Sequence, residues 1–159
     1  MFTPLVAALT LAVQPAAPCE GGPYDDFDFW LGTWDVEAGG QAAGTNTITK
    51  EENGCLIIER WTSVRGGTGQ SYNYYDPSAE VWRQVWVSAG FTIDYEGGLD
   101  DDGAMVLEGH LSPRTGGEAQ PFRGRWVLNE DGTVQQTFWL QNAETEAWDL
   151  WFDGTYTKQ

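Results

Sequence analysis

Hydrophobic and polar residues alternate along most of the chain after Pro23, in short segments rich in Val, Ile, Thr, Tyr, Phe and Trp. Clusters of Gly, Asp, Asn and Pro separate these segments at nearly regular spacing. This pattern is typical of β-strands joined by short turns, and no stretch has the period of an ordinary amphipathic helix. We expect ten strands, near Thr33–Ala38, Gly44–Lys50, Cys55–Ser63, Gly69–Tyr75, Val81–Val87, Phe91–Gly97, Ala104–Leu111, Pro121–Leu128, Thr133–Gln141 and Ala147–Thr157.

Ten strands joined by short turns predict an all-β fold, in which consecutive strands pair as an up-and-down antiparallel meander. An open meander exposes unpaired backbone groups at its two edge strands, whereas closure into a barrel removes both edges. We therefore expect a closed barrel that forms one domain over residues 19–159, a normal length for a single hydrophobic core.

The alternation also predicts which side chains face the interior. In the ninth strand Val134, Phe138 and Leu140 share the apolar face with the polar Gln136. In the seventh strand Met105, Leu107 and Leu111 oppose Glu108 and His110, and in the last strand Trp148, Leu150 and Phe152 oppose Asp149 and Asp153. The strand at 81–87 is ambiguous, because Trp82, Gln84 and Trp86 share one face while Val81, Val85 and Val87 share the other.

The composition combines a net charge of −16 with 9 Trp, 6 Tyr and 7 Phe. Disordered acidic segments are poor in aromatic residues, so this chain is expected to fold. Nucleic-acid binding is excluded as a function class, because it depends on a basic face and the chain has only 8 Lys and Arg.

The first 18 residues carry no charge, and all residues of Leu5–Val13 except Thr10 are apolar. This is the length of an export signal and too short to span a membrane. We expect residues 1–18 to be a signal peptide and the mature protein to be periplasmic or secreted. In an oxidising compartment Cys19 and Cys55 would form a disulfide; the alternative is two free thiols.

The segment around Gly32-x-Trp34 resembles the opening of lipocalin-like, calycin-type barrels. Further matches are Gly54-Cys55, Glu59-x-Trp61, Asn73-x-Tyr75-Asp76, Trp82-x-Gln84-x-Trp86-Val87, Glu96-Gly97-Gly98-Leu99 and Phe152-Asp153-Gly154-x-Tyr156. Together they resemble an uncharacterised bacterial lipocalin-like family, the domain of unknown function 1579. The resemblance implies a short helical turn before the first strand, a barrel with an internal cavity, and a floor in which Lys158 packs across the Trp34 indole above Gly32. It implies no activity.

The candidate ligand site consists of polar residues placed among aromatic ones: Glu59, Trp61, Asn73, Tyr75, Trp82, Gln84, Trp86 and Gln136. An aromatic cavity with a few converging polar groups is typical of a small-molecule pocket, although the same residues could simply form a core with satisfied hydrogen bonds. Glu59 is the acid that we expect inside the barrel, where desolvation would raise its pKa.

Three functions follow from these features. The leading hypothesis is an exported barrel that binds a small apolar or aromatic molecule without catalysis. The second is a small barrel enzyme, of the isomerase, cyclase or decarboxylase type, with Glu59 and Tyr75 as its acid and base. The third is a domain with a solid core that acts through its surface. We expect no cofactor and no metal, because His110 lies on the polar face of its strand and the acidic segments lack the spacing of calcium loops.

Overall fold

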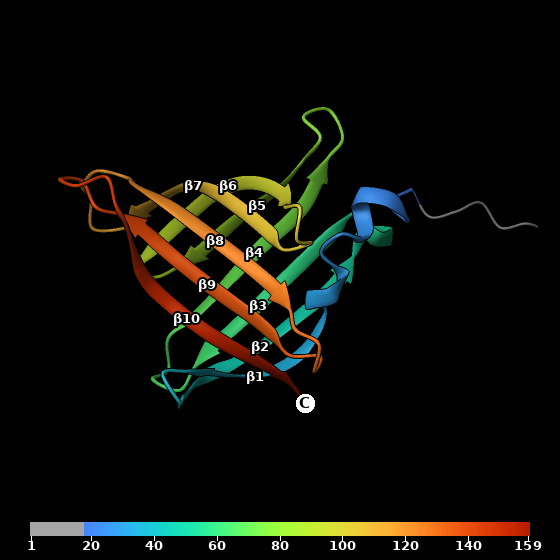
Figure 1. Cartoon of the computed structure of the whole chain (residues 1–159), viewed down its shortest axis with the longest axis horizontal. Coiled ribbons are helices and arrows are strands. Elements are labelled where there is room, and N and C mark those ends of the chain that lie inside the picture. The colour runs from blue at the N-terminus through green and yellow to red at the C-terminus, as the bar shows by residue number, and fades with distance from the viewer. Residues whose placement is uncertain (1–17) are drawn as a thin grey trace, which may run out of the picture.

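The computed structural model describes residues 18–159, which form a closed antiparallel barrel of ten strands (Figure 1). The strands are β1 (Gly32–Ala38), β2 (Gln41–Glu51), β3 (Leu56–Ser63), β4 (Thr68–Asp76), β5 (Val81–Ser88), β6 (Phe91–Leu99), β7 (Met105–Pro113), β8 (Gln120–Leu128), β9 (Val134–Gln141) and β10 (Trp148–Lys158). Each strand pairs with its neighbours in the chain, and β1 pairs with β10. The predicted all-β, up-and-down barrel is confirmed.

The barrel closes where the first and last strands meet. Trp34 lies opposite Lys158 in this pair, and Val36 lies opposite Tyr156. The pairing satisfies the backbone groups of both edges, which an open sheet would leave available to other chains. The predicted signal peptide, residues 1–18, lies outside the described residues except for Pro18. No helix within residues 18–159 has the length and apolar character needed to span a bilayer.

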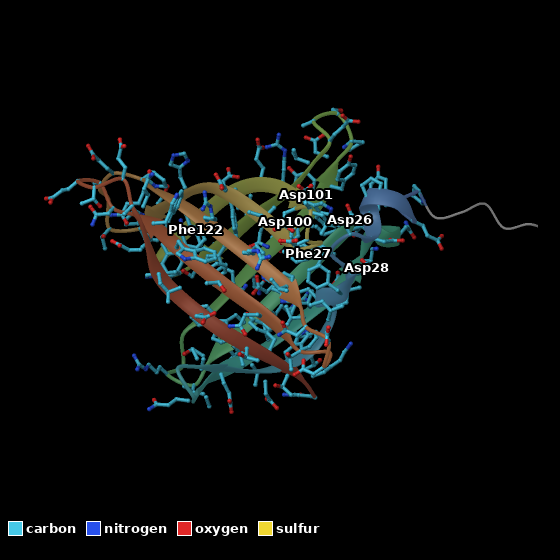
Figure 2. All side chains as sticks on the ribbon, viewed as in Figure 1. Asp26, Phe27, Asp28, Asp100, Asp101 and Phe122 are labelled. Atoms are coloured by element: carbon cyan, nitrogen blue, oxygen red, sulfur yellow. A yellow bond between two sulfur atoms is a disulfide. The ribbon has the colours of Figure 1, made fainter. Side chains whose placement is uncertain are left out.

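Two short 3₁₀ turns close one end of the barrel: η1 (Gly22–Asp25) and η2 (Asp28–Trp30). Phe27 and Trp30 are fully buried there, and their rings stack 4.9 Å apart. The Trp82 indole N–H donates to the carbonyl of Pro23 at 3.0 Å. Figure 2 shows the Phe27 ring directed from this segment toward the barrel. The predicted helical turn is confirmed, and its aromatic side chains plug this end of the barrel. A third 3₁₀ turn, η3 (Glu52–Gly54), connects β2 to β3.

A disulfide holds the N-terminal segment against the barrel. Cys19 and Cys55 are bonded across 36 residues of chain, so the predicted disulfide is confirmed. The Lys50 ammonium adds ion pairs to Asp25 and Asp28, both at 2.7 Å. The N-terminal segment is thus attached to β2 by Lys50 and to the turn before β3 by Cys55.

Tryptophan 34 lies at this closed end, on the inner face of β1. Its indole N–H donates to the carbonyl of Trp30 at 2.9 Å, and the Lys158 ammonium lies 5.2 Å from the indole centroid. Gly32 has a φ of 140°, and a Cβ at this position would lie 2.8 Å from Lys158 Cε. Glycine therefore allows the lysine to cross the chain above the indole.

The inward faces follow the alternation in most strands. Gln136 is buried on β9 beside the fully buried Val134, as predicted, and Trp82 and Gln84 settle the ambiguous fifth strand by facing inward. The prediction for Trp148 and Leu150 on β10 is wrong, because the register shifts between Leu150 and Phe152. This bulge turns Leu150 outward, where it is 62% exposed, and the Arg123 guanidinium lies over the Trp148 ring on the outer surface.

Candidate ligand cavity

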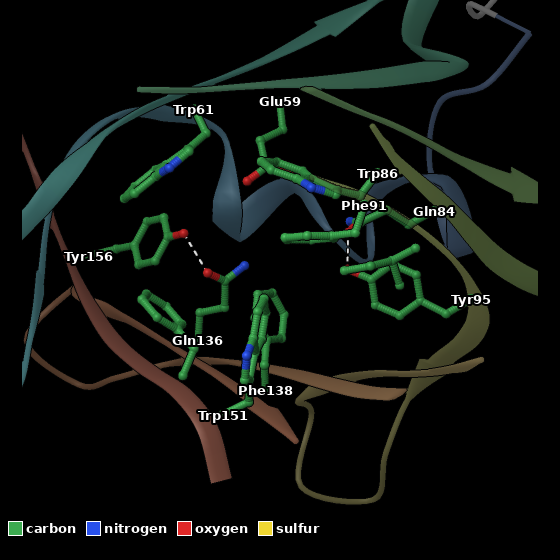
Figure 3. A pocket seen from close by; sticks show the side chains of 12 residues that line it. Glu59, Trp61, Gln84, Trp86, Phe91, Tyr95, Gln136, Phe138, Trp151 and Tyr156 are labelled. Atoms are coloured by element: carbon green, nitrogen blue, oxygen red, sulfur yellow. Dashed lines mark hydrogen bonds between the residues drawn. The ribbon is translucent and has the colours of Figure 1, made fainter. Parts of the chain in front are cut away.

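The barrel encloses a cavity of about 220 Å³ between the aromatic plug and the opposite end (Figure 3). Its walls are mostly aromatic, with five polar side chains among them. The lining residues are Glu59, Trp61, Gln84, Trp86, Phe91, Ile93, Tyr95, Gln136, Phe138, Trp151, Phe152 and Tyr156. Such a cavity combines apolar area for affinity with a few polar groups for orientation.

Glycines on neighbouring strands make room for the two indoles that flank Glu59. A Cβ at Gly44 would lie 2.7 Å from the Trp61 ring, and a Cβ at Gly69 would lie 2.1 Å from the Trp86 ring. Neither distance is possible for a real Cβ, so these backbone segments serve as the surfaces on which the indoles pack. The glycines therefore determine how closely Trp61 and Trp86 lie against the barrel wall.

The cavity opens at the end opposite the N-terminal plug, where Phe91 and Trp151 form its rim. Phe91 begins β6, and Trp151 is the extra residue in the bulge of β10. Their rings meet edge to face with centroids 5.5 Å apart, and the Trp151 ring also contacts Phe138 inside the barrel. Trp151 is 45% exposed, so the same side chain contacts the solvent and the cavity.

A continuous chain of side-chain hydrogen bonds runs around the inside of the barrel across seven strands. On one side of Glu59, Ser71 donates to Oε2 at 2.6 Å. Asn73 donates to Ser71, Gln84 donates to Asn73, and the Tyr95 hydroxyl donates to Gln84. All of these residues are buried, so their polar groups find partners in one another, as buried groups require.

The chain continues on the other side of Glu59. Asn46 Nδ2 donates to Glu59 Oε1 at 2.7 Å and to the Tyr156 hydroxyl at 3.3 Å. Tyr156 in turn donates to Gln136 Oε1. Because the amide oxygen of Gln136 accepts this bond, the amide nitrogen faces the cavity (Figure 3). The Gln136 nitrogen is therefore positioned to donate to a molecule inside the barrel.

Glu59 is 4% exposed and contributes a buried carboxyl group to the cavity wall. Burial raises the pKa of its carboxyl to about 7, although the hydrogen bonds from Ser71 and Asn46 favour the ionised form. Burial also raises the pKa of Tyr95 and Tyr156 well above the usual phenol range, and the Glu59 charge adds to this effect. Near neutral pH both phenols therefore stay protonated while Glu59 titrates.

The predicted candidate residues separate into two groups. Glu59, Trp61, Gln84, Trp86 and Gln136 line the cavity together. The other three lie outside the cavity lining. Asn73 is buried behind it as a link in the hydrogen-bond chain, whereas Trp82 and Tyr75 belong to the plugged end, where the Tyr75 ring contacts Tyr24 and Trp82.

The structure does not bring Glu59 and Tyr75 together as an acid–base pair. Ser71, not Tyr75, lies opposite Glu59 in the β3–β4 pair. Tyr75 is four residues further along β4, or about 13 Å at the usual rise of a strand. Tyr95 and Tyr156 are the phenols of the cavity. The sequence pattern predicted neither of them as a site residue, nor Asn46, Ser71 and the rim residues.

Charged residues on the outer surface take no part in the cavity. Glu108 pairs with Arg123 at 2.7 Å, and His110 is exposed on the same strand as Glu108. Asp100 accepts hydrogen bonds from the backbone of Asp102 and Ala104, so this carboxylate shapes the turn that contains it. Within the described part of the chain, no group of three His, Cys, Asp or Glu side chains is arranged to hold a metal ion.

No protein-family model matches the chain, and no curated protein matches it at a significant level. The function of the protein is therefore inferred from its fold and from the geometry of the cavity.

Proposed function

We propose that this protein is an exported barrel that binds one small, mostly apolar or aromatic molecule in its interior. The observation that carries the proposal is the aromatic cavity of about 220 Å³ with Glu59, Gln84 and Gln136 in its walls. An engineered apolar cavity of about 150 Å³ accommodates benzene, so this one has room for a single ring with a short substituent.

Two features support export to the periplasm or the exterior. The Cys19–Cys55 disulfide is a bond that persists in oxidising compartments. The uncharged apolar start of the chain, up to Pro18, has the composition of an export signal. We further propose, on the resemblance of its Gly32-x-Trp34 segment, that the barrel is related to the lipocalin-like proteins. The position of Lys158 beside the Trp34 indole supports this assignment.

A binding role fits the cavity better than a solid core or the predicted acid–base pair. The cavity is open at the Phe91–Trp151 rim, whereas the opposite end is filled by Phe27 and Trp30. Tyr75 does not line the cavity that contains Glu59, so the two groups cannot both reach a molecule bound there, as general acid–base catalysis requires. Binding without chemistry requires only the space and the polar groups that the barrel provides.

The test has two parts. Native mass spectrometry of protein purified without denaturant should show a bound mass that disappears on unfolding. Ethylbenzene, which is one ring with a short substituent, should change the tryptophan fluorescence of ligand-free protein in a saturable way. Ile93→Phe fills the cavity and should abolish this response, whereas Leu150→Phe introduces the same ring on the outer surface and should preserve it. Equal binding by both variants would contradict the proposal.

A further inference from the structure

We propose that the ligand of this cavity is a small organic ammonium ion, whose positive charge lies against the Glu59 carboxylate and the indoles beside it. The inference rests on the proposed function, because it specifies the chemical class of the molecule that the barrel holds. Its basis is a buried carboxylate that faces an aromatic cavity and has no basic partner.

All eight Lys and Arg residues of the chain lie within the described part. None of them forms an ion pair with Glu59 there, nor does the single histidine. Lys50 is held by Asp25 and Asp28, while Arg123 pairs with Glu108 on the outer surface. Buried carboxylates in proteins are normally paired, because an isolated charge is costly to remove from water. A cation inside the cavity would supply the missing partner.

The Glu59 carboxylate retains the capacity to accept such a partner. Asn46 donates to Oε1 and Ser71 donates to Oε2, which leaves part of the acceptor capacity of each oxygen unused. These two bonds fix the orientation of the carboxylate without neutralising its charge. Figure 3 shows the carboxylate directed toward the cavity, between the indoles of Trp61 and Trp86.

The surrounding aromatic rings favour a cation over other ligands. A positive charge above an indole face is attracted by the negative face of the ring, and cages of aromatic residues are a common way to bind quaternary ammonium groups. Trp61, Trp86 and Phe91 all line the same space as Glu59. An anionic ligand would instead face the carboxylate without any basic residue to compensate for the repulsion.

The net charge of −16 acts in the same direction at long range. A strongly acidic surface raises the local concentration of cations and speeds their association. The cavity volume then limits the ligand to one ring with a compact ammonium group, since about 150 Å³ accommodates a bare benzene ring.

Binding of a cation should also depend on the ionisation of Glu59. Tyr95 and Tyr156 are the other ionisable side chains of the cavity wall, and both stay protonated near neutral pH because burial raises the pKa of each phenol. Asn46 and Ser71, which contact the carboxylate directly, do not titrate. With a Glu59 pKa of about 7, the ionised fraction rises roughly tenfold between pH 6 and pH 8.

The experiment compares phenyltrimethylammonium with tert-butylbenzene, which has the same shape and no charge. Affinities for the full mature protein are measured by tryptophan fluorescence and by calorimetry at pH 8. We expect the cation to bind at least tenfold more tightly than its neutral counterpart. Glu59→Gln should weaken binding of the cation by at least tenfold and leave tert-butylbenzene unchanged or bound more tightly. Glu37→Gln, which removes one exposed charge from β1, should alter neither affinity.

The wild-type protein provides a second measurement that does not depend on the folding of a variant. Its affinity for phenyltrimethylammonium should rise roughly tenfold from pH 6 to pH 8, while that for tert-butylbenzene stays constant. Equal affinities for the two probes, or a cation affinity independent of pH, would overturn the inference and leave the small-molecule function intact. Failure of both probes to bind would contradict the proposed function itself.

Discussion

The hydroxyl of Ser71 donates to the carboxylate of Glu59 at 2.6 Å, and the two residues lie directly opposite each other in the β3–β4 pair. Both side chains point inward, so the register of two strands determines this contact. Asn73 donates to the same hydroxyl at 2.9 Å, which fixes its orientation. The buried acid is therefore held in place by the barrel wall itself.

Replacement of Glu59 by Gln should change how stability depends on pH. The pKa of the folded-state carboxyl, about 7, lies above its ordinary value of 4.5. The native state thus binds this proton more tightly than the unfolded state, and the associated stability is lost as the pH rises from 4.5 through 7. Between pH 5 and pH 8 the ligand-free wild type should lose on the order of 2–3 kcal/mol relative to Glu59→Gln. Urea denaturation at the two pH values measures this difference, and identical pH dependence in both proteins would contradict it.

Removal of the Ser71 hydroxyl should raise the pKa of Glu59 further, because its hydrogen bond favours the ionised carboxylate. We also expect Ser71→Ala to destabilise the protein by about 1–3 kcal/mol at pH 8, since it leaves buried groups of Glu59 and Asn73 with one partner fewer. A carbon-13 NMR titration of the Glu59 carboxyl measures the pKa. Ser112→Ala on the exposed face of β7 is the matched control and should leave it unchanged.

The rim of the cavity should control how fast a ligand leaves. Trp151 contacts Phe91 across the opening and is 45% exposed, so Trp151→Ala should widen the entrance. Stopped-flow fluorescence with ethylbenzene should show faster dissociation from this variant than from the wild type. Trp148→Ala removes an indole from the outer surface of the same strand and should leave the rate unchanged; a rate equally altered in both variants would exclude a role of the rim.

The disulfide should contribute to stability mainly by restricting the unfolded chain. In the chain-entropy model, a bond across a 36-residue separation stabilises a protein by about 3–4 kcal/mol. The double variant with Cys19→Ser and Cys55→Ser should therefore have a free energy of unfolding that is lower by about this amount, as measured by urea denaturation. Reduction of the wild type should reproduce the effect, whereas the double variant should not respond to reductant. Equal stability with and without the bond would contradict this prediction.

The sequence alone predicted the barrel because its main determinant is local. Alternation places Val134 and Gln136 on one face of β9, and short turn segments force consecutive strands to pair. The same alternation placed Glu108 and His110 outside the barrel. Cys19 and Cys55 could be paired because the described chain contains no other cysteine.

The contacts inside the barrel could not be predicted from the sequence, because they join residues that are far apart in the chain. Asn46 meets Tyr156 across 110 residues only because β1 and β10 close the barrel between them. The bulge on β10 turned Trp151 toward the cavity and Leu150 away from it, which strict alternation does not predict.

Local pattern therefore determined which residues form strands and, in most strands, which of them face inward. It could not determine how far along the barrel each inward residue lies. Glu59 and Tyr75 share the interior but lie at different heights, whereas Glu59 and Ser71 share one level through the strand register. Register and closure are properties of the whole sheet, so only the assembled barrel decided which polar groups surround the carboxylate.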